Sequence, residues 1–116
     1  MSTFSFTSNL FFLDFVILLV LFSSQHVPYS DQETYLLQAE EQFSERNFDL
    51  AEKLYDDAIL SSRKHRFLNE EALANELAGH FYRDTGRKEK SSRDFSQAED
   101  KYREWGAIAK ADAISQ

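Results

Sequence analysis

Three side chains that could ligate a metal ion follow one another at helical spacing in the second half of the chain. Glu76, His80 and Asp84 are four residues apart, which places them along one face of a helix. Carboxylate and imidazole groups are zinc ligands, so this pattern deserves a test as a metal site. Three ligands from a single helix converge poorly on one ion, however, and the same spacing is typical of a solvated face with charge pairs. We therefore expect no metal, no other cofactor and no catalytic residue here.

The other polar groups also predict solvated surface rather than a reaction centre. Neighbouring carboxylates diverge by about 100° on a helix, so they cannot act as one acid–base pair and are expected to be solubility and helix-start charges. These pairs are Glu40–Glu41, Asp56–Asp57 and Glu70–Glu71. His65 lies in the basic run 63–66, where positive charge complements the carboxyl end of a helix. Because the sequence contains no cysteine, a disulfide framework, a thiolate zinc site and a cysteine nucleophile are excluded.

The negative charge of the chain is concentrated in one segment. The formal net charge of the 116 residues is −7 at pH 7. Residues 31–57 contain nine acidic and two basic side chains, whereas residues 58–116 contain ten acidic and eleven basic ones. Such a chain repels the phosphate backbone, so we expect no nucleic-acid partner. The acidic segment 31–57 favours a basic protein partner instead.

Residues 1–28 differ in composition from the rest and form a separate hydrophobic N-terminal segment. Six of the eleven phenylalanines lie between positions 4 and 22, and Asp14 is the one charged residue. The densest apolar run, residues 10–22, is shorter than the roughly 20 residues that cross a bilayer as a helix. Three hypotheses stay open: a membrane anchor through residues 8–24, a cleaved signal peptide, and neither of these, which includes a hydrophobic helix packed on the body or a mis-called start. The localisation is accordingly membrane-associated through this segment or cytoplasmic.

Residues 29–116 have the helix-capping signals and the apolar periodicity of a helical domain. Glycine and proline are scarce, with three and one respectively, which argues against a β-sandwich or barrel. The segment Ser30-Asp31-Gln32-Glu33 has capping-box spacing, so a helix is expected to begin there. Apolar residues at helical spacing predict helices over 31–45, 48–66, 69–85 and 88–104, with a fifth, short helix from Ala107. The predicted fold class is all-α.

The second and fourth predicted helices repeat each other at an offset of 40 residues. The matching positions are Phe48/Lys88, Ala51/Ser91, Tyr55/Phe95 and Ala58/Ala98. In each copy an aromatic residue lies between two small residues, so that the helix can approach a neighbour closely while the ring fills the groove. The preceding helices match too, because Ala39 and Gly79 come shortly before the aromatic residues Phe43 and Tyr82. The sequence therefore predicts two stacked helix hairpins.

This pattern resembles the tetratricopeptide repeat, whose unit is a hairpin of two helices. The second copy matches the small, aromatic and turn-glycine positions of that family at Gly79, Tyr82, Gly86, Phe95 and Ala98, and Ser91 stands where alanine is usual. The resemblance implies two stacked hairpins with a C-terminal cap helix, preceded here by a hydrophobic N-terminal helix.

The first copy departs further from the family. It matches at Ala39, Phe48, Ala51, Tyr55 and Ala58. Arg46 replaces the turn glycine, however, and Gln42 replaces an aromatic residue. The period is 40 residues instead of about 34, and the additional residues around 61–67 predict a longer second helix in the first hairpin.

A narrower resemblance covers residues 47–114. The strings N-F-D-L-A-E-K-L-Y, E-A-L-A-N-E-L-A and W-G-A-I-A-K are similar to the helical repeat region of large multidomain signalling kinases. The resemblance implies a linker between kinase-like and ATPase domains on one side and sensor and histidine-kinase domains on the other, or a fragment of such a protein. The sequence has no glycine-rich phosphate loop, H-R-D loop or D-F-G motif, so we expect no enzyme activity.

We therefore expect a non-catalytic protein–protein interaction module. Its concave face, between the predicted helices 31–45 and 69–85, would hold a partner peptide, neighbouring repeats or a kinase domain. Trp105 and Tyr102 are expected to pack the cap helix over the end of the stack, and Phe67 is expected to be a core contact. The alternative is a small membrane-anchored or secreted structural protein in which residues 1–28 are the functional element.

Overall fold

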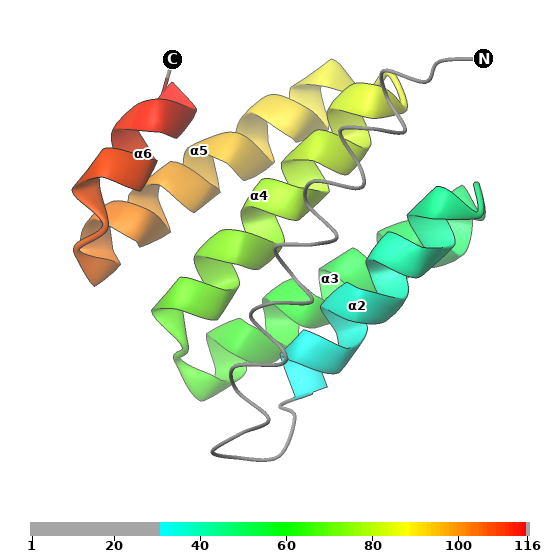
Figure 1. Ribbon diagram of the computed structural model, residues 1–116, viewed down its shortest axis with the longest axis horizontal. Helices are drawn as coiled ribbons and strands as arrows, with labels where there is room; N and C mark the ends of the chain where they lie inside the picture. Colours follow the sequence, from blue (N-terminus) through cyan, green and yellow to red (C-terminus); the bar gives the residue numbers. More distant parts are fainter. Residues whose placement is uncertain (1–30, 116) are drawn as a thin grey trace.

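The computed structural model describes residues 31–115, and in this range the chain consists of helices joined by short turns, without a strand. The helices are α2 Asp31–Ser44, α3 Phe48–His65, α4 Leu68–Asp84, α5 Lys88–Trp105 and α6 Ile108–Ser115 (Figure 1). The all-α prediction is confirmed, and each predicted helix end lies within one residue of the observed one. The hydrophobic helix predicted within 1–28 and the capping residue Ser30 lie outside the described residues.

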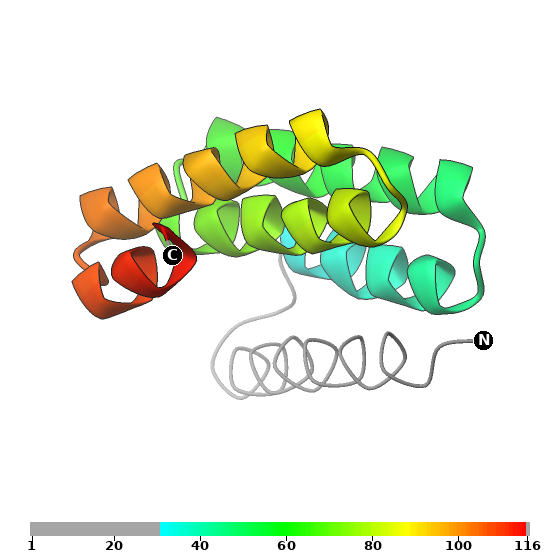
Figure 2. The same cartoon turned by 90° about the horizontal axis from the view of Figure 1, so that it is seen from above.

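The helices pack on one another in chain order. α2 packs on α3, α3 on α4, α4 on α5 and α5 on α6. Figure 2 shows two layers, with α3 and α5 in one and α2, α4 and α6 in the other. The predicted helices 31–45 and 69–85 are thus neighbours in the same layer, and α6 continues that layer.

The turns between the helices follow a spacing of 20 residues. α3, α4, α5 and α6 begin at Phe48, Leu68, Lys88 and Ile108. A left-handed backbone conformation recurs at the same spacing, with φ of 64° at Arg46, 60° at Arg66, 84° at Gly86 and 106° at Gly106. After each of these residues, the next N–H group donates to the carbonyl group five residues earlier, as in a Schellman motif. Glycine adopts this conformation freely, whereas arginine does so at a cost of about 1–2 kcal/mol.

The second helix of each hairpin is long, although the sequence assigned additional residues only to positions 61–67 in the first. α3 and α5 each contain 18 residues. The offset of 40 residues therefore arises from two successive units of 20, each comprising one helix and one turn. α3, the second helix of the first hairpin, is thus long, and α5 has the same length.

The main hydrophobic core fills the space between α2, α3 and α4. Its buried members are Leu36, Ala39, Phe43, Ala51, Tyr55, Ala58, Ile59, Leu73, Ala74, Leu77, Ala78, Phe81 and Tyr82. A second, smaller core joins α4, α5 and α6 through Ala72, Ala98, Tyr102 and Ala111. α4 contributes to both cores, which explains why ten consecutive residues of it, 70–79, are buried.

Small residues allow α4 and α5 to approach each other closely. A Cβ atom added to Gly79 would lie only 2.8 Å from Phe95 Cδ1, so a side chain here would displace that ring. The Ser91 hydroxyl donates a hydrogen bond to the Gly79 carbonyl oxygen at 2.8 Å, across the same contact. Ala58 and Ala98 have no exposed surface at all.

Leucine at Ala58 or at Ala98 is expected to lower the free energy of unfolding by about 1–3 kcal/mol, because a larger side chain forces the packed helices apart. Thermal unfolding followed by circular dichroism measures the effect. Leucine at Ala109, which is exposed on α6, provides the control and is expected to leave stability unchanged. Unchanged unfolding of both the Ala58 and the Ala98 variants would contradict the alignment of the two hairpins.

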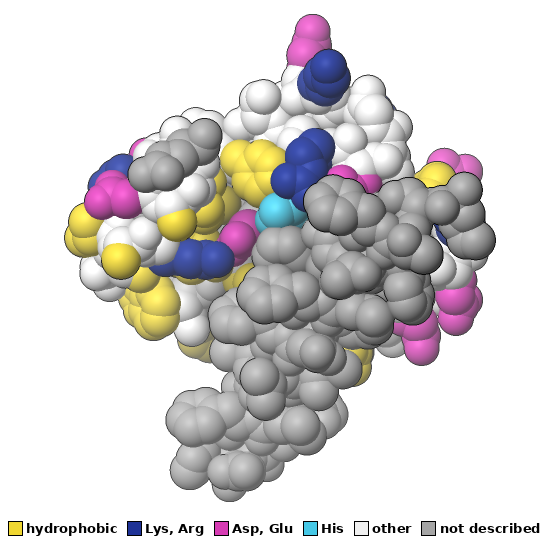
Figure 3. Space-filling view, turned by 45° about the horizontal axis from the view of Figure 1, so that its top comes forward, with side chains coloured by type: hydrophobic (Ala, Val, Ile, Leu, Met, Phe, Trp, Pro, Cys, Tyr) yellow, Lys and Arg dark blue, Asp and Glu magenta, His cyan; other side chains and the backbone are white. Residues whose placement is uncertain are grey.

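Two large aromatic side chains lie on the surface, contrary to the expectation from the sequence. Trp105 is 55% exposed and Phe67 is 44% exposed. α6 packs on Tyr102 instead, through Ala107, Ala111 and Ile114. Trp105 is the last residue of α5, and the left-handed turn at Gly106 brings α6 back over Tyr102, one helical turn earlier. Hydrophobic side chains consequently remain on the surface at the end of the molecule that α6 forms (Figure 3).

Candidate functional site

Most of the predicted packing positions are buried in the structure. The buried ones are Ala39, Phe43, Ala51, Tyr55, Ala58, Gly79, Tyr82, Ser91, Ala98 and Tyr102. Phe48 is 37% exposed, although its ring meets that of Phe43 edge-on, and Phe95 is half-buried. Gly86 and Trp105 are exposed.

Glu76, the first residue of the predicted metal-site pattern, is buried and has its own partners. Its Oε1 atom accepts a hydrogen bond from the Tyr102 hydroxyl at 2.9 Å, and Oε2 accepts one from Lys110 Nζ at 3.0 Å. Burial, and then the charge of Glu76, raise the pKa of Tyr102. The expectation of a solvated face is wrong at Glu76, because α5 and α6 bring hydrogen-bond donors to it.

His80 and Asp84 do not complete a metal site with Glu76. His80 Nε2 lies 4.0 Å from Glu76 Oε2. Burial, followed by the positive charges of Arg83 and Lys110, lowers the pKa of His80 to about 4, so the imidazole is neutral at pH 7. Asp84 pairs with Arg83 at 3.2 Å. Among residues 31–115, no group of three or more histidine, aspartate or glutamate side chains is placed to hold a metal ion.

A second buried carboxyl group joins α2 to α3. The Tyr55 hydroxyl donates a hydrogen bond to Glu40 Oε2, and the two residues are 0% and 6% exposed respectively. Burial raises the pKa of Glu40 to about 7, the hydrogen bond from Tyr55 opposes this change, and the charge of Asp84 adds to it. The positions 40 residues after Glu40 and Tyr55 are His80 and Phe95. Their rings are in contact, with 4.9 Å between the centroids. The first hairpin thus has a polar contact where the second has an aromatic one.

Two further carboxylates that the sequence assigned to solvated surface are buried between helices. Glu71 Oε2 accepts a hydrogen bond from Arg63 Nε at 3.0 Å, and Glu70 Oε1 accepts one from Gln32 Nε2 at 2.7 Å. These bonds tie the start of α4 to α3 and α2. Sequence reasoning missed them because the partners are 8 and 38 residues away and belong to other helices.

The face between α2 and α4, where the sequence predicted a partner site, is lined by buried side chains. Leu36, Leu73 and Leu77 are 1%, 3% and 1% exposed. Glu33 and Glu40 are also buried. Leu36, Leu73 and Leu77 belong to the main core between α2, α3 and α4.

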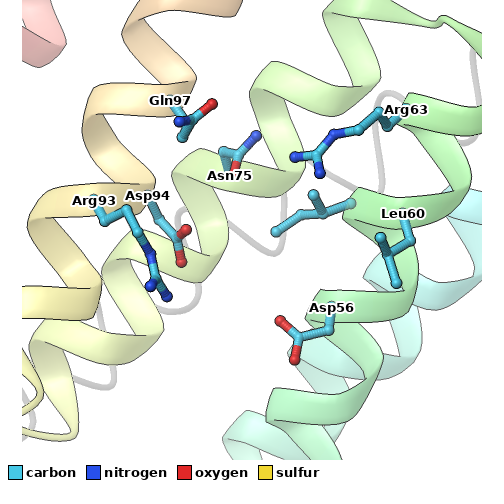
Figure 4. A pocket seen from close by; sticks show the side chains of 8 residues that line it. Asp56, Leu60, Arg63, Asn75, Arg93, Asp94 and Gln97 are labelled. Carbon is cyan, nitrogen blue, oxygen red and sulfur yellow. The ribbon is translucent and has the colours of Figure 1, made fainter.

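An open hollow lies in the other layer, between α3 and α5 (Figure 4). Its volume is about 330 Å³, and it is lined by Asp56, Ile59, Leu60, Arg63, Asn75, Arg93, Asp94 and Gln97. The α3 residues recur every three to four positions, as do those of α5, so each set lies on one face of its helix. The buried Asn75 of α4 lies between the two walls.

Two carboxylates point toward each other across this hollow, Asp56 from α3 and Asp94 from α5 (Figure 4). Burial raises the pKa of Asp94 to about 6, an effect that Arg93 opposes and Asp56 strengthens. Asp56 is exposed on α3, and partial desolvation, followed by the charge of Glu52, raises its pKa. Within residues 31–115, neither carboxylate accepts a hydrogen bond or forms an ion pair. The hollow therefore presents acceptor oxygens that the fold itself does not use.

Comparison of the chain with protein families, with curated proteins and with solved structures found no match. Any role of the hollow between α3 and α5 therefore has to be inferred from the side chains that line it. In the part of the chain that the structure describes, no helix combines the length and the apolar character needed to span a membrane. Residues 8–24, for which a membrane anchor is one of three hypotheses, lie outside that part.

Proposed function

We propose that the chain is a non-catalytic protein–protein interaction module made of tetratricopeptide-like hairpins, similar to the helical repeat region of signalling kinases. The observation that carries the proposal is the 20-residue spacing of helix starts and left-handed turns, which produces hairpins of one pattern. Stacked hairpins bury their apolar faces against one another and present extended surfaces to partners. α6 follows α5 at the same spacing, in the position of the first helix of a further hairpin.

The surface that we assign to the partner is the hollow between α3 and α5. It is open, whereas the leucine side chains between α2 and α4 are buried. Leu60, 59% exposed, provides apolar contact beside the polar groups of the hollow, and interfaces commonly combine the two. Of the nine acidic residues of segment 31–57, Asp56 lines the hollow, and together with Asp94 of α5 it favours a basic partner. Neighbouring repeats and kinase domains are the partners that the resemblance implies.

Site-specific photocrosslinking in cells tests this function. A benzoylphenylalanine in place of Gln97, which is exposed at the hollow, is expected to give a discrete adduct of higher mass. The same group in place of Ser92, which is exposed on α5 and does not line the hollow, is expected to give none. The absence of a discrete adduct from both Gln97 and Leu60 would contradict the proposed function.

A further inference from the structure

We propose that the hollow between α3 and α5 binds the guanidinium group of an arginine side chain from the protein partner. The assignment rests on the proposed interaction function and names the chemistry that its partner must supply. In the proposed complex, Asp56 and Asp94 hold the guanidinium group between the two walls, across which their carboxylates face each other (Figure 4). Ile59 and Leu60 line the aliphatic part of the arginine side chain.

Asp94 is the residue that points to a ligand. It is only 8% exposed, its carboxylate is directed into the hollow, and it has no hydrogen-bond or ion-pair partner within residues 31–115 (Figure 4). The Asp94 oxygens face the open hollow and accept no hydrogen bond from the described residues, so a donor that enters the hollow can bind them. A cationic donor also relieves the repulsion between Asp94 and Asp56.

The acceptor groups around the hollow come from three helices. Asn75 donates its Nδ2 group to the Glu71 carbonyl oxygen at 3.0 Å, which leaves its own side-chain oxygen as an acceptor. Together with Asp56 and Asp94, Asn75 thus offers acceptor atoms from the floor and from both walls. A guanidinium group has five N–H donors in one plane and no acceptor, so it matches this arrangement.

The two arginines that line the hollow do not make it an anion site. Arg63 Nε is held by Glu71 Oε2 at 3.0 Å, so its charge is paired. Arg93 lies on α5 next to Asp94, and its positive charge opposes the rise in the pKa of Asp94. An anion would have to lie between two carboxylates, whereas an incoming cation competes with the charges of Arg93 and Lys90. The volume of about 330 Å³ is at the lower end of the roughly 300–1,000 Å³ of ligand pockets, which suits one side chain.

A peptide-binding experiment on the full chain tests the proposal. The probe is a fluorescein-labelled Gly-Arg-Gly-Arg-Gly peptide at low ionic strength, compared with counterparts that carry citrulline or lysine in place of arginine. Citrulline has nearly the same shape but no charge. We expect the Kd of the arginine peptide to be lower than that of the citrulline peptide by about tenfold or more.

Three variants locate the binding site. Asp94→Asn is expected to raise the Kd of the arginine peptide about tenfold, whereas Asp100→Asn, with the same loss of charge outside the hollow, leaves it within about twofold. Arg93→Gln is expected to lower the Kd because it removes one of the two cations that compete for the carboxylates. Thermal unfolding at pH 7.5 is expected to be unchanged or higher in Asp94→Asn, so weaker binding by this variant is not caused by misfolding.

Several outcomes overturn the proposal. These are equal binding of the arginine and citrulline peptides, equal binding of the arginine and lysine peptides, equal Kd values for Asp94→Asn and Asp100→Asn, and weaker binding by Arg93→Gln. A photocrosslinked adduct at Gln97 that persists in the Asp94→Asn background overturns the guanidinium site but retains the interaction function. The loss of adducts at both Gln97 and Leu60 in the unmutated background contradicts the interaction function itself.

Discussion

Replacing Phe81 by alanine is expected to lower the free energy of unfolding by about 3–5 kcal/mol. The ring has no exposed surface, and its centroid lies 5.1–6.2 Å from those of Phe43, Phe48, Tyr55 and Tyr82. Its removal leaves a cavity where α2, α3 and α4 meet, and the surrounding helices can close it only in part. The total free energy of unfolding of a small domain is about 5–15 kcal/mol, so this substitution is expected to remove much of the stability. Urea unfolding followed by far-UV circular dichroism measures the change.

Phe67→Ala is the matched control, since it removes the same ring from the surface. Phe67 is 44% exposed and stacks on His65, with ring centroids 6.1 Å apart. Substitutions at such positions change stability by about 0.5 kcal/mol or less. Equal losses from Phe81→Ala and Phe67→Ala would contradict the placement of Phe81 at the centre of the core.

Replacing Glu40 by glutamine is expected to remove a pH dependence of stability of about 3 kcal/mol between pH 4.5 and pH 7. In the folded chain, burial raises the pKa of Glu40 from 4.5 to about 7. Between these two values the folded state keeps the proton that the unfolded state has released. The contribution of Glu40 to stability is therefore greatest below pH 4.5 and is lost as the pH rises through 7.

The measurement is the free energy of urea unfolding of both proteins at several pH values. The advantage of Glu40→Gln over the unmutated chain is expected to grow from pH 4.5 and to level off above pH 7. Glutamine retains an acceptor oxygen for the Tyr55 hydroxyl, so the hydrogen bond is kept. Glu41→Gln, on the exposed neighbouring residue, is the control and is expected to follow the unmutated profile. Parallel profiles for Glu40→Gln and the unmutated chain would disprove the burial of a titrating carboxyl group.

Helix positions could be predicted closely because their signals are local. Gly86 and Gly106 ended helices where the sequence placed those ends, and both have positive φ. Arg46 has the same left-handed conformation without being glycine, since the 20-residue spacing of the helices requires a turn there. The small residues Ala58, Gly79 and Ala98 were recognised as packing positions because of their spacing from aromatic residues, and each is buried.

The candidate site could not be predicted in the same way. Asp56 and Asp94 are 38 residues apart in the sequence, and each belongs to an ordinary run of charged residues on its own helix. The stacking of α3 beside α5 over Asn75 turns them into two sides of one hollow. Trp105 shows the opposite error: its size suggested burial, but its position at the last residue of α5 leaves it exposed.

The sequence by itself determined the helices, their order, their turns and their small contact residues, because these depend on interactions within a few residues along the chain. The tertiary structure alone decided which charged groups are buried. Glu40 receives a hydrogen bond from α3, and Glu76 receives hydrogen bonds from α5 and α6, so both carboxyl groups are satisfied within the stack. The burial and the partners of a charged side chain depend on helices that are far away in the sequence. Helical periodicity, which reflects spacing within one helix, does not predict those contacts.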